Sequence, residues 1–298
     1  MNKRIASQRE KTGINGHTRL AGVVGWPIGH TLSPAMQNAA FRHHGLNVAY
    51  LPLGVSPAGL AAFCRGLRPL EPAGLNITVP HKEAVIPLLD GLAASASVMG
   101  AVNTVVCRAG RWIGHNTDGF GFLASLKGIL APQGLQVVLL GGGGAGRAVA
   151  FSLAQAGAAR ITLVEPDSGR RNRLIRDLKQ RLGYSAVVAA RPGTAELRSA
   201  LDRCALLVQA TPLGLQARDP LPLPEPWMPE GICVYDLVYG RQLTPFLRLA
   251  KRRRNRVVPG WKMLLGQGAE AFRLWTGKQP PVKLMQEALL SAGGLKEI

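Results

Sequence analysis

The sequence predicts an α/β protein of two domains, and three observations support this. Short apolar runs alternate with helix-patterned segments along most of the 298 residues, which is typical of mostly parallel sheets. The Pro/Gly-containing stretch APQG at 131–134 interrupts this alternation, and a complete βαβ pattern restarts after it. That second pattern contains the loop GGGGAG, which is typical of a Rossmann-type dinucleotide-binding domain. We therefore expect an N-terminal α/β domain with a mostly parallel sheet, followed by a Rossmann-type domain.

In the first half we expect strands at 20–25, 47–53 and 74–78. Helices are predicted at 33–45, where Pro34 lies in the first turn and Gly45 at the end, near 56–66, and from Pro80 onward. The segments AVNTVV and RWIG flank CRAG at 107–110 and predict a hairpin, which would place an antiparallel element at the sheet edge. Residues 120–130 are predicted as a helix that leads away from this domain.

The second half continues the alternation. Strands are predicted at 136–140, 160–165, 185–190, 205–210 and 232–238, with helices at 147–157, 168–182 and 194–203 between them. The proline-rich residues 221–229 are predicted as a loop, and two helices follow a turn at Pro259 and Gly260. The expected organisation is a flexible basic extension at 1–18, a substrate domain at 19–122, a dinucleotide domain at 123–260, and C-terminal helices at 261–298.

Composition excludes several classes of protein. No apolar run approaches the ~20 residues of a membrane helix, and the first residues lack the apolar core of a secretion signal, so we expect a cytoplasmic protein. The four cysteines are scattered, with no CxxC pair and no histidine at metal-ligand spacing. We therefore expect neither a metal site nor a disulfide framework.

The chain is strongly basic, with 36 Lys and Arg against 17 Asp and Glu and a net charge of +19. Such a charge can indicate nucleic-acid binding or attraction for small anions. Only residues 251–256 and the arginines around Arg170 are clustered, and neither group is interleaved with aromatic residues that could stack on bases. We interpret most of the charge as solvated surface and expect neither nucleic acid nor membrane as a partner.

The glycine loop is the clearest binding motif. Gly141, Gly143 and Gly146 stand in GxGxxG spacing between a predicted strand and a predicted helix. They would provide the tight turn, the close approach to a pyrophosphate, and the close packing of helix on strand. Glu165, about twenty residues downstream, is placed to accept the ribose hydroxyls of NAD. Arg170 and Arg171 just beyond could instead bind the 2′-phosphate of NADP, although a solvated helix face is their simpler interpretation.

A second cluster of polar residues lies in the first half. GHNTDG, at 114–119, places Asp118 where a strand turns into a helix, and helix capping is the simplest reading of it. Asn76 and Thr78, two apart at a strand end, share one face, and Lys82 follows them in the first turn of the predicted helix. A lysine there is electrostatically unfavourable, so it is either a surface residue or a proton carrier. HTLS at 30–33 and VNT at 102–104 add polar groups at strand ends, where open α/β sheets bind ligands.

Together these segments resemble the shikimate dehydrogenase family. Eight blocks occur in that family's order over residues 21–276: GWPIGHTLSPAMQNAAF, GLNITVPHKEAV, GAVNTVV, GHNTDGFGFL, GGGGAGRAV, ATPLG, DLVYGRQLTPFL and MLLGQGAEAFRLWTG. The resemblance implies a two-domain enzyme that reduces 3-dehydroshikimate to shikimate with a nicotinamide cofactor, usually NADP, in aromatic amino-acid biosynthesis. It also implies that the final helices fold back on the first domain, and that the enzyme is a monomer or a homodimer.

The resemblance also assigns roles to individual residues. Lys82 matches the proton carrier and Asp118 its catalytic partner, which orients the lysine and binds a neighbouring hydroxyl of the substrate. Thr31 and Ser33 match the hydroxyl residues that hold the substrate carboxylate. The remaining substrate-pocket positions are Asn76, Thr78, Asn103, Tyr239 and Gln267. The cofactor positions are Gly141, Gly143, Gly144, Ala145, Gly146, Glu165, Arg170, Thr211, Leu237 and Gly260.

Four positions depart from the family pattern. Thr31 replaces a serine, Gln209 an asparagine and Lys262 a glycine, and Glu-Pro-Asp at 165–167 replaces the Asn-Arg-Thr that grips the 2′-phosphate. These differences leave the cofactor as NADP or NAD, and they keep an NAD-dependent quinate/shikimate dehydrogenase as an alternative. A nucleic-acid-binding protein and a catalytically silent ligand sensor are the competing hypotheses from outside the enzymes. The first leaves the glycine loop unused, and the second has no need for both Lys82 and Asp118.

Overall fold

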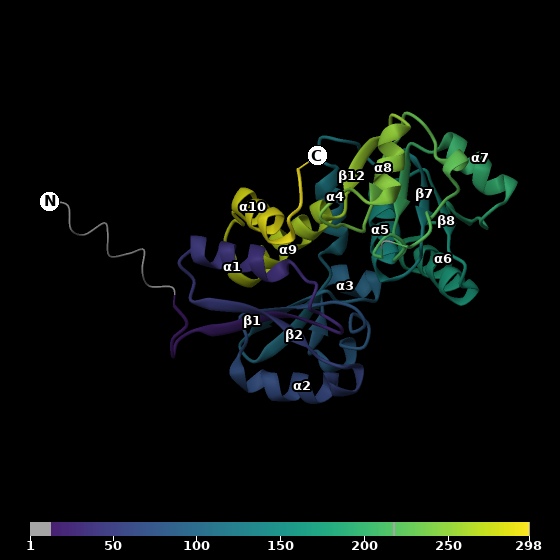
Figure 1. Cartoon of the computed structure of the whole chain (residues 1–298). Helices are drawn as coiled ribbons and strands as arrows, with labels where there is room; N and C mark the ends of the chain where they lie inside the picture. Colours follow the sequence, from purple (N-terminus) through teal and green to yellow (C-terminus); the bar gives the residue numbers. More distant parts are fainter. Residues whose placement is uncertain (1–12, 217, 298) are drawn as a thin grey trace. The chain divides into compact units, whose positions relative to one another are not determined.

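A computed structural model of the chain describes residues 13–216 and 218–297, which form two compact units (Figure 1). The first unit comprises residues up to Thr117 together with 268–292, and the second comprises 118–267 together with the residues after 292. Most of the basic extension expected at 1–18 lies outside the described residues. Within its described part, the hydroxyl of Thr18 donates to Asn47 Oδ1 at 2.7 Å.

The sheet of the first unit has the order β2-β1-β3-β5-β6-β4. Its strands are β1 (Arg19–Gly25), β2 (Val48–Gly54), β3 (Gly74–Ile77), β4 (Gly91–Leu92), β5 (Thr104–Arg108) and β6 (Arg111–His115). β5 pairs antiparallel with both β3 and β6, whereas β1 pairs parallel with β2 and β3, and β4 pairs parallel with β6. The predicted mostly parallel sheet and its hairpin are therefore confirmed, with the unpredicted β4 outside the hairpin.

Helices lie on both faces of this sheet, with α1 (Ser33–His43) on one face and α2 (Leu60–Leu67) on the other (Figure 1). Leu60, Cys64 and Leu67 of α2 share a buried core with Leu75 and Trp112 of the sheet. On the α1 face, the ring of Phe41 lies 5.4 Å from that of Phe272. The remaining helices of this unit are α3 (Ala94–Met99), α10 (Val282–Gly293) and the end of α9 (Trp261–Thr276), which contains the unit boundary at residue 268.

The helix predicted from Pro80 is wrong. The chain forms turns after Pro80 and then a short 3₁₀ helix at Ile86–Leu88. Pro87 lacks a backbone N–H, and its ring would collide with the carbonyl four residues earlier, so a helix that begins at Pro80 cannot continue past Pro87. The buried ring of His81, whose Nε2 lies 2.7 Å from the carbonyl oxygen of Val55, fixes the turn in place. The helix-dipole argument made for Lys82 therefore does not apply.

The second unit has an all-parallel sheet of order β12-β11-β10-β7-β8-β9. Its strands are β7 (Gln136–Leu140), β8 (Arg160–Val164), β9 (Val187–Ala189), β10 (Leu206–Gln209), β11 (Cys233–Asp236) and β12 (Arg256–Pro259). Numbered within this unit, the order is 3-2-1-4-5-6 reversed, which is the Rossmann arrangement. The predicted fold class is confirmed.

The helices of this unit are α4 (Asp118–Leu126), α5 (Gly144–Gln155), α6 (Ser168–Leu182), α7 (Ala195–Arg203) and α8 (Pro245–Arg252). Apolar residues of α7 and α8, such as Leu201 and Phe246, pack in one core with Val138, Leu207 and Val234 of the sheet. The helix predicted at 120–130 starts earlier and ends at Leu126, because Gly128 adopts a left-handed conformation. Helix α8 and strand β12 were not predicted.

The cysteines form no disulfide, and three of the four are buried. Within the described ranges, no helix combines the length and the apolar character that crossing a bilayer requires.

A buried carboxyl group joins β11 to α8. Asp236 is fully buried, and it accepts a hydrogen bond from Thr244 Oγ1 through one oxygen and from the Val238 backbone N–H, at 3.0 Å, through the other. Thr244 in turn caps α8 by accepting from Leu247 N. Burial raises the pKa of Asp236 to about 7, and the two hydrogen bonds oppose this shift.

This pKa predicts a loss of stability as the pH rises. Below about pH 4 the carboxyl is protonated in both states, whereas between pH 4 and 7 the folded state retains a proton that the unfolded state has lost. The free energy of unfolding should therefore fall through this window. Asp236→Asn, which cannot ionise, should show a shallower fall, measured by urea denaturation at pH 4.5, 6 and 7.5. The same slope in the variant and the wild type would contradict the assignment.

Candidate active site

Buried polar side chains meet at the edge of the first sheet where the parallel strands end. Asn76, at the end of β3, donates to the carbonyl oxygen of Asn103 and to the hydroxyl of Thr104, both at 3.1 Å. Asn103 Nδ2 donates to Thr117 Oγ1 at 3.0 Å, and its Oδ1 accepts from the Thr117 backbone N–H at 2.7 Å. These four side chains are nearly inaccessible to solvent. Because buried polar groups must be paired, the network fixes the ends of β3, β5 and β6 against one another.

Tyr50 extends the network to α1. Its hydroxyl donates to Asn76 Oδ1 at 2.7 Å, and Ser33, the first residue of α1, hydrogen-bonds the same phenol. Burial raises the pKa of Tyr50 well above its usual value, so the phenol stays protonated and can keep donating. Sequence reasoning missed Tyr50 and Thr104, because a phenol in an apolar strand and a threonine in a hairpin carry no local signal of their partners.

The other predicted residues of the first unit lie around this network. Thr31, in the loop after β1, accepts a hydrogen bond from the Ser33 backbone N–H at 3.3 Å. Thr78 follows β3 directly, and its methyl group occupies the space that a side chain at Gly25 would need. Lys82 is half-buried, and its carbonyl oxygen accepts from the Val102 backbone N–H at 2.8 Å, which holds the Pro80 turn beside Asn103.

Three further predicted residues belong to the second unit. Asp118 is buried and begins α4, directly after Thr117 in the chain. Gln267 is buried in α9, where its side-chain amide donates to the carbonyl oxygen of Leu264 at 2.9 Å. Tyr239 follows β11, and burial raises the pKa of its phenol.

The glycine loop has the geometry that a dinucleotide needs. Gly141 adopts φ +98°, a conformation that favours glycine. A Cβ on Gly146 would lie 2.1 Å from the carbonyl oxygen of Gly141, so helix α5 approaches strand β7 only because no side chain stands there. Cβ atoms at Gly143 and Gly144, by contrast, would meet nothing within 4 Å. With Ala145 in the first turn, the positive N-terminal end of α5 therefore faces open space, and the loop fits a pyrophosphate.

Both oxygens of the Glu165 carboxylate accept hydrogen bonds from the backbone. One oxygen accepts from the Gly142 backbone N–H at 2.8 Å, and the other accepts from the Asp167 N–H at 3.0 Å. Nη1 of Arg170 lies 3.5 Å from Oε2 of Glu165, and the Arg171 side chain donates to the backbone carbonyl oxygen of Glu165 at 3.1 Å. Glu165 is thus held against the glycine loop, the position expected for a residue that contacts the cofactor ribose, and its charge is partly balanced by Arg170.

Two further predicted cofactor positions, Thr211 and Gly260, are held by close contacts with neighbouring residues. The buried Gln209 holds the loop that contains Thr211. The Gln209 side chain accepts from the Thr211 N–H at 2.8 Å and donates to the carbonyl oxygen of Leu213 at the same distance. Gln209, which stands where the family pattern has an asparagine, therefore fixes the position of this loop. A Cβ on Gly260 would lie 2.1 Å from the carbonyl oxygen of Leu237, so these two residues touch only because position 260 is glycine.

Comparison with known proteins agrees with these features. The model of the shikimate dehydrogenase substrate-binding domain matches residues 23–105, and that of the shikimate 5'-dehydrogenase C-terminal domain matches 260–290. The shikimate dehydrogenase (NADP(+)) of Moorella thermoacetica is 45% identical over 283 residues, 94% of this chain and 96% of its own length.

Solved structures show the same relationship. Shikimate 5-dehydrogenase from Thermus thermophilus, in complex with NADP(H) and shikimate, is 37% identical with a TM-score of 0.82, over 92% of this chain and 100% of that one. Quinate dehydrogenase from Corynebacterium glutamicum, in complex with NAD, is 32% identical with a TM-score of 0.85, over 92% and 99%. The chain therefore belongs to the shikimate dehydrogenase family.

Proposed function

We propose that this chain is a shikimate dehydrogenase, which reversibly reduces 3-dehydroshikimate to shikimate with NADPH as the hydride donor. The observation that carries the proposal is the buried network from Ser33 to Thr117 at the edge of the first sheet. A ring with several hydroxyls and one carboxylate needs many neutral hydrogen-bonding groups in fixed positions and few charges. The network supplies such groups, and the Rossmann-type unit supplies the cofactor cradle.

The residues of the chain divide the work of the reaction. Thr31 and Ser33 hold the substrate carboxylate, and Asn76, Thr78, Asn103, Tyr239 and Gln267 bind the ring hydroxyls. The cofactor, when bound along Gly141–Gly146, supplies the hydride. Lys82 gives a proton to the C3 oxygen during reduction and takes it back during oxidation, and Asp118 supports the lysine and binds a neighbouring hydroxyl.

The cofactor is NADP for the relatives whose names state it, and we extend this preference to the present chain. Arg170 supports it, because its guanidinium lies beside Glu165 and is half exposed, so it can turn to a 2′-phosphate. Glu165 opposes it, so we also expect measurable turnover with NAD. The quinate alternative is not favoured, because the curated relatives at 41–45% identity are named shikimate dehydrogenases.

The remaining parts of the proposal concern the setting. Residues 19–122 bind the substrate, 123–260 bind the cofactor, and the C-terminal helices at 261–298 complete the substrate domain. The enzyme works in the cytoplasm as a monomer or a homodimer, on small molecules and without nucleic acid or membrane as a partner.

The direct test is an absorbance assay at 340 nm with shikimate and either NADP or NAD. We expect turnover that is faster with NADP, and little with quinate. Absence of turnover with both acids and both cofactors would remove the enzyme proposal and favour the ligand-sensor hypothesis.

Lys82→Met should lower kcat by about 10²-fold or more while the KM for shikimate changes little, because general acid–base catalysis usually contributes this much. Steady-state kinetics measures both parameters. Lys179→Met, on the exposed face of α6, is the matched control and should behave as the wild type. If Lys82→Met keeps activity within a few fold of the wild type, another group carries the proton.

Glu165→Gln should raise the ratio of kcat/KM for NADP to that for NAD by about tenfold or more. Two like charges ~4 Å apart repel by about 4 kcal/mol at an effective dielectric constant near 20, and Arg170 and solvent cancel part of this. Glutamine keeps the acceptor for the Gly142 N–H and loses only the acceptor for the Asp167 N–H. Glu165→Ala should shift the ratio in the same direction. Glu196→Gln, an exposed acid on α7, is the control, and an unchanged ratio in both Glu165 variants would place the carboxylate away from the ribose.

A further inference from the structure

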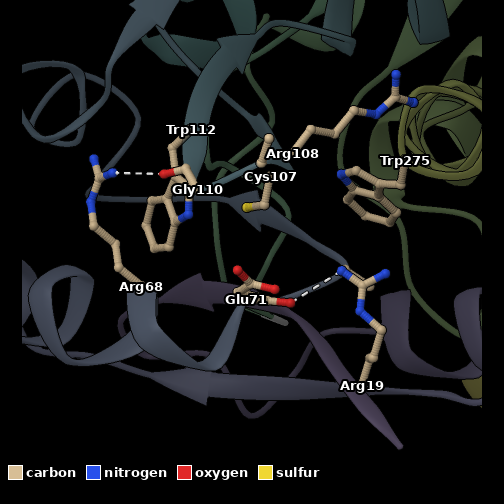
Figure 2. A pocket seen from close by; sticks show the side chains of 10 residues that line it. Arg19, Arg68, Glu71, Cys107, Arg108, Gly110, Trp112 and Trp275 are labelled. Carbon is tan, nitrogen blue, oxygen red and sulfur yellow. Dashed lines mark hydrogen bonds between the residues drawn. The ribbon is translucent and has the colours of Figure 1, made fainter.

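We propose that a cavity beside the N-terminal ends of β1 and β3, at the opposite end of these strands from the candidate active site, binds a small organic anion with a flat apolar body. The cavity has a volume of about 270 Å³ and lies wholly within the first unit. Figure 2 shows the side chains around it: Arg19 from β1, Arg68 and Glu71 from the segment before β3, Cys107, Arg108, Gly110 and Trp112 from the hairpin, and Trp275 from α9.

This cavity is separate from the candidate active site. Arg19 begins β1 and Ala73 precedes β3, whereas the substrate residues follow the other ends of these strands. Because β5 runs antiparallel to β3, its last residue, Arg108, also lies at the cavity edge, and its first residue, Thr104, pairs with Asn76. Thr78 lies five positions after Ala73, about 16 Å at ~3.3 Å per residue.

The rim of the cavity carries two arginines that backbone carbonyls hold in place. Arg19 donates to the carbonyl oxygens of Glu71 at 3.1 Å and Pro72 at 3.5 Å, and Arg108 donates to that of Leu274 at 3.0 Å. Among the described residues, neither guanidinium lies within 4 Å of a carboxylate. Each has five N–H donors, so both keep donors for an anion.

Arg68, the third arginine of the cavity, is already paired with a carboxylate and forms part of the cavity wall. Arg68 pairs with Asp90 at 2.8 Å and covers the ring of Trp112 at 4.9 Å. Of the described residues that line the cavity, Glu71 alone carries a carboxylate, against the two guanidinium groups of Arg19 and Arg108. One net positive charge remains, which suits a monoanion better than a dianion or a cation.

Two tryptophan rings add apolar surface to the inner wall, and polar groups make up the larger share of the exposed lining. Trp112 and Trp275 are almost fully buried, and Trp275 is fixed because its Nε1 donates to the carbonyl oxygen of Val105 at 3.0 Å. Cys107 lies between them (Figure 2), and burial raises the pKa of its thiol to about 12 despite the opposing effects of Arg19 and Arg68. A neutral thiol is not a nucleophile at pH 7, so the anion is held without a covalent bond. The small volume and aromatic wall favour a ring with one carboxylate.

The test is isothermal titration calorimetry of the full-length protein with benzoate. The titration is made without shikimate and again in the presence of saturating shikimate. Saturating shikimate occupies the active site, so the remaining binding reports the cavity. We expect millimolar or tighter binding, which higher salt weakens, and no binding of benzylamine. Binding that disappears with shikimate, or no binding at all, would overturn the proposal.

Arg19→Met with Arg108→Met should weaken benzoate binding by about tenfold or more, because it removes the charge-assisted hydrogen bonds. The charge-matched control is Arg65→Met with Arg203→Met, two exposed residues outside the cavity, and it should bind as the wild type. Neither pair touches the active site, so shikimate kinetics should stay unchanged and report correct folding. If the double variant melts early, the two single variants carry the same test. Undiminished benzoate binding in the Arg19 and Arg108 variants would overturn the proposal.

Discussion

The first unit depends on one chain of buried hydrogen bonds, which runs from Ser33 through Tyr50, Asn76 and Asn103 to Thr117. Each member comes from a different segment, and each is buried, so leaving any polar atom unpaired would cost about 1–3 kcal/mol. The five segments therefore pair their buried polar atoms with one another in this arrangement. That arrangement places hydroxyls and amides at the sheet edge before any substrate arrives, and pre-organised groups lose less entropy on binding.

In the second unit, buried polar side chains also fix neighbouring segments, and here their partners are backbone N–H groups of loops. Glu165 and Gln209 are buried side chains at the ends of β8 and β10, and each accepts a hydrogen bond from a backbone N–H of a loop at the proposed cofactor site. Asp236 does so at the end of β11. In all three cases a polar side chain braces a loop at the carboxyl end of a parallel strand, which is the edge where such sheets bind ligands.

Local signals in the sequence were sufficient for five of the six strands of the second sheet and for most of the first sheet. The glycine loop and the alternation of strands with helices predicted the βαβ unit, and α6 has its predicted bounds, 168–182, with Asp167 as its N-cap. The Thr244-Pro245 pair, a cap followed by proline at the first helical position, was a usable signal for α8 that the prediction did not take up. The four-residue β12 has no such signal, because so short a strand is defined by its neighbour β11.

Long-range contacts explain what the sequence could not reveal about the site. Motif matching located Ser33, Asn76 and Asn103, but the role of Tyr50 depends on partners 17 and 26 positions away. The bonds of Glu165 to Gly142 likewise join residues 23 positions apart. The false helix at Pro80 is different, because Pro87 was a local signal against it, and the contact of the His81 ring with Val55 only fixes the resulting turn.

The most direct test of the central claim is Tyr50→Phe, which keeps the ring and removes only the hydroxyl at the centre of the chain. Tyr184→Phe is the matched control, because its hydroxyl donates to a backbone carbonyl in the second unit. We expect Tyr50→Phe to lower kcat/KM for shikimate by about tenfold, the effect of displacing one or two substrate hydrogen bonds, while the KM for the cofactor stays unchanged. An unchanged kcat/KM for shikimate in Tyr50→Phe would show that the network is structural only, and would contradict the account.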